Sequence, residues 1–242
     1  MTTVLVTGST DGVGRATADA LLEEGHDVIV HARTTQRLDA VQDLLDRGAR
    51  SVVGDLADLG QVRSLADQVG EAGGCDAVIH NAGVFDGPSV LPVNVVAPYV
   101  LTELLPGVAR VVYVSSGMHR GGRADLAGID WSGDTSRTYS DSKLFVTTLM
   151  AAMARRRPDM IAHAVDPGWV PTKMGGPGAT DDLALAHVTQ VWLATSDDPE
   201  ALASGRYWFH GRVEDTAAAV TDEAFQDALC ASLADHAAAS EG

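Results

Sequence analysis

Tyr139 and Lys143 lie four positions apart in the segment Tyr139-Ser-Asp-Ser-Lys143, and their side chains could together move a proton. On a helix, residues i and i+4 share a face, so the ammonium group would lie beside the phenol. A phenol with its ordinary pKa of about 10 is a weak acid–base group at neutral pH. A nearby positive charge favours the phenolate and lowers that pKa. The pair is therefore a candidate proton relay, and the alternative is an ordinary surface helix.

The composition indicates one sizeable domain with an acidic surface. The chain has 242 residues, 45% of them hydrophobic, which is enough for one large α/β domain. Its net charge of −16 argues against a nucleic-acid partner, because phosphate binding needs a basic surface. Cys75 and Cys230 are the only cysteines, so we expect reduced thiols in a cytoplasmic protein, and no metal site. No apolar run approaches the roughly 18 residues of a membrane span, so we expect no membrane anchor.

Short apolar runs alternate with amphipathic segments along the whole chain. This alternation predicts a parallel sheet with helices on both faces, joined by right-handed crossovers. The expected fold is a Rossmann-type, doubly wound α/β sheet in three layers, forming a single domain over residues 1–242. Strands are expected at 4–6, 27–31, 51–53, 77–80, 111–114, 161–165 and 206–209. Helices are expected at 13–24, 35–47, 59–70, 93–105, 138–156, 181–195 and 222–239.

A glycine-rich turn connects the first strand to the first helix. Glycines allow a tight turn and a close approach to a pyrophosphate, and the helix N-terminus adds free N–H groups and a positive dipole end. The strand–turn–helix context makes this a predicted dinucleotide site. The residues expected to contact the cofactor here are Gly8, Ser9, Thr10, Asp11, Gly12, Val13 and Gly14.

Arg33 follows Ala32 at the end of the second strand, where the adenosine ribose of a bound dinucleotide would lie. A carboxylate there would bind the 2′-hydroxyl of NAD, whereas a guanidinium can pair with the 2′-phosphate of NADP. The sequence therefore favours NADP(H), with NAD(H) and an unengaged arginine as the alternatives.

The ends of the third and fourth strands carry further candidate cofactor contacts. Asp55 could accept a hydrogen bond from the adenine amine, and Leu56 could pack on the ring. The alternative is that Asp55 caps the next helix, with Asp58 as the rival cap. Asn81-Ala82-Gly83 has small residues that would let the cofactor lie against the sheet, although Asn and Gly also favour simple turns.

Taken together, these motifs resemble the short-chain dehydrogenase/reductase family over about residues 3–210. The matching residues keep the family's order along the chain. They are the Thr-Gly-x-x-x-Gly-x-Gly turn at 7–14, Asn-Ala-Gly at 81–83, Asn94, Ser115-Ser116, Tyr139 with Lys143, and Pro167-Gly168 followed by Thr172.

The resemblance implies a role for each residue. Tyr139 would be the general acid in carbonyl reduction, and Ser116 would donate a hydrogen bond to the substrate oxygen. Lys143 would bind the nicotinamide ribose and lower the pKa of Tyr139, and Asn94 would hold a water that links Lys143 to solvent. The two hydroxyl donors would stabilise the charge that hydride transfer leaves on that oxygen. The remaining implied cofactor contacts are Pro167, Gly168, Val170 and Thr172.

Three connection lengths depart from the family pattern. Only 11 positions separate Gly83 from Asn94, and 22 separate Asn94 from Ser116, so the helices there must be short or absent. Because family members often form homo-oligomers through these helices, a monomer is an open alternative. Conversely, 23 positions separate Ser116 from Tyr139, a longer connection than is usual.

This insertion is similar to that of the retinol-dehydrogenase-like branch, which often takes lipophilic carbonyl compounds and prefers NADP. Within it, Trp131 could line the substrate pocket or anchor the loop. The Gly-rich residues 173–182 could form a mobile lid, within a substrate-loop region at 172–200.

The sequence therefore predicts an NADP(H)-dependent oxidoreductase that interconverts a ketone or aldehyde and an alcohol. One alternative is an NAD-dependent alcohol dehydrogenase of the same family, and another is a dinucleotide-sensing regulatory protein without catalysis. An epimerase or dehydratase on the same scaffold is a third. The substrate cannot be identified from the sequence, since pocket loops vary.

Overall fold

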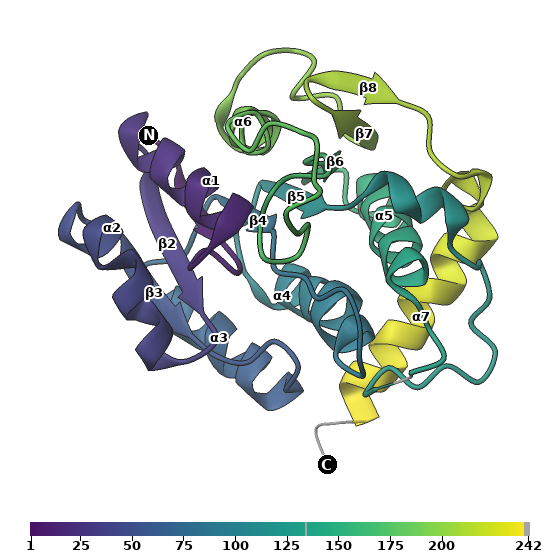
Figure 1. Ribbon diagram of the computed structural model, residues 1–242. Coiled ribbons are helices and arrows are strands. Elements are labelled where there is room, and N and C mark those ends of the chain that lie inside the picture. The colour runs from purple at the N-terminus through teal and green to yellow at the C-terminus, as the bar shows by residue number, and fades with distance from the viewer. Residues whose placement is uncertain (134, 240–242) are drawn as a thin grey trace.

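A computed structural model describes residues 1–133 and 135–239. In these residues, strands form a single sheet in the order β3-β2-β1-β4-β5-β6-β7-β8 (Figure 1). The strands up to β7 are parallel, and β8 is antiparallel to β7. Their bounds are β1 Thr3–Val6, β2 Asp27–Ala32, β3 Arg50–Val53, β4 Ala77–His80, β5 Arg110–Val114, β6 Ile161–Asp166, β7 Arg206–Phe209 and β8 Arg212–Glu214.

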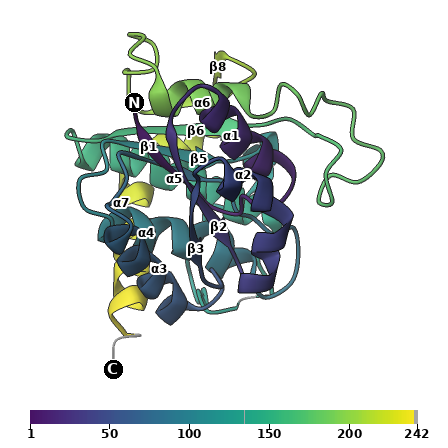
Figure 2. The same ribbon diagram turned by 90° about the vertical axis from the view of Figure 1, so that its left-hand side faces the viewer.

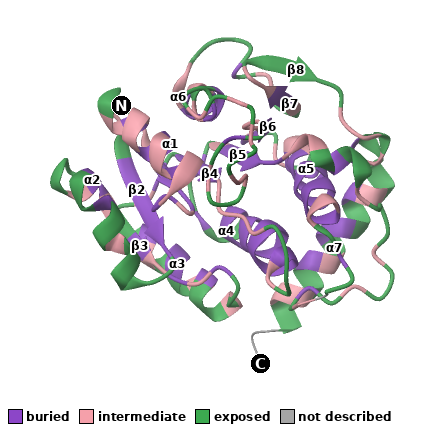
Figure 3. Cartoon of the chain, viewed as in Figure 1, coloured by how far each residue is buried: buried purple, intermediate pink, exposed green. Residues whose placement is uncertain are grey.

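Helices cover both faces of this sheet (Figures 1 and 2). One apolar cluster joins the sheet to α1 (Gly12–Glu23), α2 (Gln42–Asp46) and α6 (Val188–Thr195). A second cluster, on the other face, includes α3 (Leu59–Glu71), α4 (Ala97–Leu104), α5 (Tyr139–Arg156) and α7 (Glu223–Ala239). Figure 3 shows that the central strands and most of α5 are buried, while α2 and α3 expose their outer sides. The predicted three-layer Rossmann-type fold is confirmed.

Strands β2 and β3 are added on one side of β1, and β4 and the later strands are added on its other side, so the order of the sheet reverses between β1 and β4. In doubly wound sheets, ligands bind outside the carboxyl ends of the strands at such a point. The two strands end level with each other, because Val6 pairs with Ile79 and the Thr7 amide donates to the Ile79 carbonyl at 3.0 Å. The fold therefore brings the glycine-rich turn and the Asn-Ala-Gly segment together at the carboxyl ends of the strands.

A capping box sets the first residue of α5. The Thr138 hydroxyl accepts a hydrogen bond from the Asp141 amide at 3.2 Å, and the Asp141 carboxylate accepts one from the Thr138 amide at 2.9 Å. Such caps stabilise a helix by about 1 kcal/mol. Because α5 then starts at Tyr139, the phenol lies at the N-terminal end of the helix, near the carboxyl ends of the strands and one turn before Lys143.

Three predicted helices differ from those observed. Residues 35–47 form a 3₁₀ helix at Thr35–Val41 followed by the short α2, instead of one helix. Residues 93–105 begin with a π-helical turn at Pro92–Val96, in which the Ala97 amide donates to the Pro92 carbonyl. Pro98 explains this, because it has no N–H to donate to the carbonyl four residues earlier. The resulting α4 is short, as the connection lengths predicted, whereas oligomeric state stays a prediction.

The helix predicted at 181–195 begins only at Val188. Residues 182–188 instead form successive turns with hydrogen bonds between residues three apart, such as Leu185 to Asp182. Leu185 remains 52% exposed, so this stretch has little buried apolar face to stabilise an α-helix. Strand β8 and the 3₁₀ helix at Gly117–Gly121 were not predicted. Both segments are short, β8 is exposed throughout, and neither carries a clear periodic pattern.

Two global expectations can be compared with the structure. Cys75 and Cys230 are both buried and neither is in a disulfide. Among residues 1–133 and 135–239, no helix has the length and apolar character that crossing a bilayer requires.

Candidate active site

The glycine-rich turn has a shape that only glycines permit. Gly8 and Gly12 have φ angles of +63° and +52°, in the left-handed region that other residues avoid. A Cβ on Gly14 would lie 2.3 Å from Asn81 Nδ2 and 2.5 Å from the Gly8 carbonyl oxygen. Asn81 Nδ2 donates to the Thr7 carbonyl at 2.9 Å and so holds the turn against β4. These residues form a cradle of the kind that receives a pyrophosphate.

His31, on the neighbouring strand β2, supports the same turn through a hydrogen bond. It is buried on β2, where its Nδ1 accepts from the Gly8 amide and its Nε2 contacts the Gly54 carbonyl oxygen, each at 2.9 Å. Burial lowers the pKa of His31, although the Gly54 carbonyl opposes this, so the ring is neutral with its proton on Nε2. Sequence reasoning missed this residue because a histidine within a strand has no distinctive pattern.

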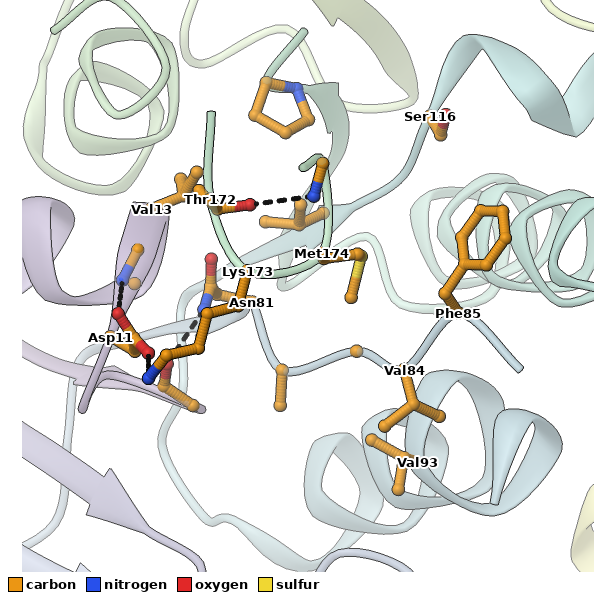
Figure 4. A pocket seen from close by; sticks show the side chains of 18 of the residues that line it. Asp11, Val13, Asn81, Val84, Phe85, Val93, Ser116, Thr172, Lys173 and Met174 are labelled. Carbon is orange, nitrogen blue, oxygen red and sulfur yellow. Dashed lines mark hydrogen bonds and ion pairs between the residues drawn. The ribbon is translucent and has the colours of Figure 1, made fainter. Parts of the chain in front are cut away.

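The loop after β6 reaches across to the glycine-rich turn. Asp11 caps α1, with its Oδ1 accepting from the Gly12 amide at 2.9 Å. Its other oxygen is paired with Lys173, and the hydrogen bond from Lys173 lowers the pKa of Asp11 (Figure 4). A Cβ on Gly12 would lie 3.1 Å from Thr172 Cγ2, so the two segments are in close contact. The loop thus closes over the position expected for a pyrophosphate.

One cavity of about 1030 Å³ extends from the glycine-rich turn to Tyr139. Ligand cavities usually measure roughly 300–1,000 Å³, so this one has room for a dinucleotide and a small substrate. Of the predicted site residues, Ser9 and Asn94 do not line it. The predicted residues that do are Gly8, Thr10, Asp11, Gly12, Val13, Gly14, Arg33, Asp55, Leu56, Asn81, Ala82, Gly83, Ser116, Tyr139, Lys143, Pro167, Gly168, Val170 and Thr172.

Ser9 is fully buried, and its side chain serves the fold instead of the cavity. Its Oγ accepts from the His31 amide at 2.8 Å, which ties the glycine-rich turn to β2. The Ser9 side chain therefore does not line the cavity, and the predicted contact of Ser9 with the cofactor stays a prediction. A serine in a glycine-rich turn can face either way, and its orientation depends on the neighbouring strand.

Two arginines line the end of the cavity near β2. Arg33 is exposed there, as predicted. Arg37, which sequence reasoning missed, lines the same end and donates from Nη2 to the Thr10 hydroxyl at 2.9 Å. The only signal for Arg37 was its position four residues after Arg33. This end of the cavity is therefore suited to an anionic group.

Asp58, and not Asp55, caps α3, since Asp58 Oδ1 accepts from the Gln61 amide at 3.1 Å. Asp55 Oδ1 accepts from the Ala57 amide at 3.0 Å, within a turn at the cavity wall. The alternative in which Asp55 is the helix cap is therefore wrong, and its contact with adenine stays a prediction.

Lys143 lies at the other end of the cavity, on α5. Its side chain is buried, and Nζ donates to the Val114 carbonyl at 2.7 Å. Nζ lies 5.3 Å from the centroid of the Tyr139 ring. Burial lowers the pKa of Lys143 to about 8, with the carboxylate of Asp166 opposing that shift.

Tyr139 does not have the lowered pKa that the sequence predicted. Burial raises its pKa to about 12, the Asp166 carboxylate adds to this, and a hydrogen bond with Ser116 opposes it. Lys143 is not among the groups that shift this pKa, and its ammonium group donates to the Val114 carbonyl. As arranged here, Tyr139 is a protonated phenol over the physiological pH range.

The two serines after β5 have different surroundings. Ser115 is buried, and its Oγ lies 2.6 Å from the Thr147 hydroxyl on α5. Ser116 lines the cavity and forms the hydrogen bond with Tyr139. Its Oγ also accepts from the Met118 amide at 3.2 Å, which starts the 3₁₀ helix at Gly117–Gly121. Both serines line the cavity, Ser116 is the one hydrogen-bonded to Tyr139, and its role towards a substrate stays a prediction.

Asn94 lies in the π-helical turn and joins the loop after β4 to α5. Its Oδ1 accepts from the Val84 amide, and its Nδ2 donates to the Val84 carbonyl and to the Ser142 hydroxyl, all at 2.9 Å. A Cβ on Gly83 would lie 3.4 Å from Asn94 Oδ1 and 3.7 Å from Lys143 Nζ. The side chain is thus near Lys143, while the water that it was predicted to hold stays a prediction.

The rim of the cavity beside Tyr139, which we call the reaction end, is apolar and open. Phe85, Met118, Trp169 and Met174 all line the cavity, and each side chain is roughly half exposed. The rings of Phe85 and Tyr139 lie 4.9 Å apart. Figure 4 shows Phe85, Met174 and Ser116 around this end. Exposed apolar side chains gathered at one cavity are typical of a binding site.

Trp131 lies away from this rim. It is 4% exposed, donates from Nε1 to the Ser232 hydroxyl at 2.8 Å, and packs edge-on against Phe145 at 5.8 Å. Of the two interpretations of Trp131, the structure supports the one in which it anchors the insertion to α5 and α7.

Comparisons with known proteins agree with this geometry. The short chain dehydrogenase family model matches residues 2–182. A short-chain dehydrogenase, chyC of Penicillium rubens, is 36% identical over 217 residues, covering 84% of each chain. Retinol dehydrogenase 14 of Mus musculus is 29% identical over 272 residues, covering 91% of this chain and 81% of the relative. A crystal structure of an uncharacterised protein from Mycobacterium paratuberculosis superposes with a TM-score of 0.77 at 27% identity, covering 96% of this chain and 93% of the other. The chain belongs to the short-chain dehydrogenase family of oxidoreductases.

Proposed function

We propose that this protein is an NADP(H)-dependent carbonyl reductase in which Tyr139 is the general acid. The observation that carries the proposal is that one cavity is lined by the glycine-rich cradle and by Ser116, Tyr139 and Lys143. A cofactor site and two hydroxyl donors in one cavity are what reduction of a carbonyl requires.

Each residue at the reaction end has a distinct task. A bound nicotinamide cofactor would supply the hydride for the carbonyl carbon. Ser116 and Tyr139 line the same cavity and would both donate hydrogen bonds to the carbonyl oxygen, and Tyr139 would give up its proton as that oxygen becomes an alkoxide. Because burial raises the pKa of Tyr139 to about 12, the phenol carries that proton at neutral pH. Lys143 would bind the sugar next to the nicotinamide, and its ammonium group would return a proton towards Tyr139.

The preference for NADP(H) over NAD(H) rests on Arg33 and Arg37. Both line the end of the cavity next to β2, where the adenosine ribose would lie. Two guanidinium groups suit a 2′-phosphate, although Arg37 also lies 4.0 Å from Asp11 Oδ2, so Arg33 is the residue on which the preference mainly rests. Comparing kcat/KM with NADPH and NADH tests this, and a value equal or higher with NADH would contradict it.

The substrate that fits the apolar rim is a lipophilic carbonyl compound. Phe85 and Trp169 offer flat faces, while Met118 and Met174 can adapt their shape. A panel of aromatic ketones, aliphatic aldehydes and keto acids, followed through the absorbance of NADPH, tests this directly. Turnover of keto acids alone would contradict a lipophilic substrate. The substrate-loop region at 172–200 is proposed to close over the compound.

The rival function is dinucleotide sensing without catalysis. A sensor needs the cradle but not the hydrogen-bonded Ser116 and Tyr139 beside the buried Lys143. Cofactor binding without turnover of any carbonyl in the panel would favour the sensor, whereas turnover that depends on Tyr139 excludes it.

A further inference from the structure

Asp166 joins two loops that surround the reaction end. It is the last residue of β6 and lines the cavity. Its Oδ2 accepts from the Gly117 amide at 2.6 Å, next to Ser116, and its Oδ1 accepts from the Gly168 amide at 2.9 Å. One carboxylate thus fixes both the loop after β5 and the turn after β6.

A third donor completes the surroundings of this carboxylate. The Tyr207 hydroxyl, on β7, donates to Asp166 Oδ2 at 3.3 Å. Tyr207 is buried, and burial raises its pKa, so it remains a donor. The ring of His119 lies 4.7 Å from that of Tyr207 on one side. All three partners donate hydrogen bonds, so the site requires an ionised carboxylate, which only accepts them.

An amide could not take the place of this carboxylate. An asparagine has a single acceptor oxygen, and its NH₂ group would point at one of the N–H donors. The two backbone amides cannot reorient, because each belongs to a turn that is fixed by the neighbouring strand. Replacement would therefore release either Gly117 or Gly168 from β6.

The charge of Asp166 acts on the reacting groups as well. Two ionisable groups face each other and Tyr139 here, namely Lys143 from α5 and Asp166 from β6, and the carboxylate raises the pKa of both Tyr139 and Lys143. Around Asp166 itself lie Tyr207, His119, and Arg120, which is paired with Glu214 at 3.0 Å. Ionisation of the carboxylate therefore favours the protonated forms of Tyr139 and Lys143.

We propose that Asp166 is a positioning residue, which fixes Ser116 through the Gly117 amide and the turn after β6 through the Gly168 amide, and whose charge lies in the same cavity as Tyr139. This inference deepens the proposed reductase function and rests on it. Asp166 touches neither the carbonyl oxygen nor the hydride. Its contribution is to place the Ser116 hydroxyl, and its charge gives the pH profile a signature that a merely structural residue would not have.

The test compares Asp166→Asn with Asp76→Asn. Asp76 is exposed and lies outside the cavity, and its Oδ2 accepts from the Thr3 amide at 2.7 Å, so it controls for loss of one carboxylate that binds a backbone amide. Loss of Ser116 alignment should lower kcat for reduction about tenfold in Asp166→Asn, with KM for NADPH changed by less than about twofold. Asp76→Asn should leave kcat within about threefold of the wild type.

The pH dependence separates this role from a merely structural one. The carboxylate raises the pKa of Tyr139, so its removal lowers that pKa. The pH at which reduction declines, and the pH at which alcohol oxidation rises, should therefore both move down in Asp166→Asn but not in Asp76→Asn. Asp166→Glu keeps the charge, so it should restore the pH profile while kcat remains low. An unchanged profile in Asp166→Asn would overturn the proposal.

A measurement without turnover distinguishes this inference from the proposed function. Phenolate absorbance is titrated in the wild type and in Asp166→Asn, and the signal of the matching Tyr139→Phe variant is subtracted from each. The Tyr139 step should move to lower pH in Asp166→Asn even if no carbonyl in the panel is reduced. A step at the same pH contradicts the inference alone. If Asp166→Asn does not fold, kcat of Asp166→Glu decides: the longer side chain cannot hold both backbone amides as Asp166 does, so kcat should fall about tenfold, and a kcat within about threefold of the wild type would overturn the proposal.

Discussion

The two ends of the cavity are built in different ways. At the cofactor end, the backbone carries the geometry, with Gly8 and Gly12 in left-handed conformations and Gly14 packed against Asn81. At the reaction end, side chains carry it, through Tyr139 and its neighbours. The rim there is exposed and belongs to loops. A site built from backbone tolerates few substitutions, whereas one built from side chains on loops can change its substrate while the fold is kept.

Removing the Tyr139 hydroxyl should lower activity more than any other change, and it should act at the reaction end alone. Tyr139→Phe deletes the proton donor but keeps the ring that packs on Phe85. Because general acid catalysis contributes about 10²–10⁴-fold, kcat for reduction should fall by about 10³. The dissociation constant of NADPH, measured by fluorescence titration, should change less than about threefold. Activity within tenfold of the wild type would show that another group is the acid.

The second largest effect is expected from Gly14→Ala, which crowds the glycine-rich turn at the cofactor end of the cavity. A Cβ on Gly14 would overlap both Asn81 Nδ2 and the Gly8 carbonyl oxygen. Gly14→Ala should therefore destabilise the fold by about 1–3 kcal/mol and weaken cofactor binding at least tenfold. The matched control is Gly70→Ala on α3, where an added Cβ meets nothing within 4 Å. That change should stabilise the fold by about 0.5–1 kcal/mol in urea unfolding, since glycine is unfavourable within a helix.

Reversing the charge of Arg33, at the cofactor end, should change the choice between NADPH and NADH without disturbing the backbone. Arg33→Asp should raise KM for NADPH about 10–100-fold and leave KM for NADH within about threefold, because only the 2′-phosphate would be repelled. Arg212→Asp, at the opposite edge of the sheet, is the control for net charge. An equal loss with both cofactors would mean that Arg33 serves the fold and not the choice of cofactor.

The smallest effect should come from the pair that links the two ends. Lys173 is largely exposed, so its ion pair with Asp11 contributes modestly. Lys173→Met should increase the rate of NADPH release up to about fivefold, measured by stopped-flow displacement, with kcat for chemistry in single turnovers unchanged. The effect should shrink at high salt, and one that persists at 1 M salt would not be electrostatic.

The parts of this protein that the sequence predicted are those governed by local rules. Alternating apolar segments gave the strands and most helices, and the Gly8–Gly14 turn is visible because glycine is the residue that tolerates its backbone angles. The segment from 35 to 47 and the residues before Val188 were predicted wrongly. Their helical spacing was present, but packing and turn hydrogen bonds prevailed over it.

The sequence by itself determined the family, the sheet and the motif residues that line the cavity. The tertiary structure decided their orientation and their protonation. It turned Ser9 inward, brought Arg37 and Asp166 to the cavity, and made Tyr139 a protonated acid. Spacing along a chain fixes which face of a helix a residue occupies, whereas burial and the charges of segments more than twenty residues away set its pKa.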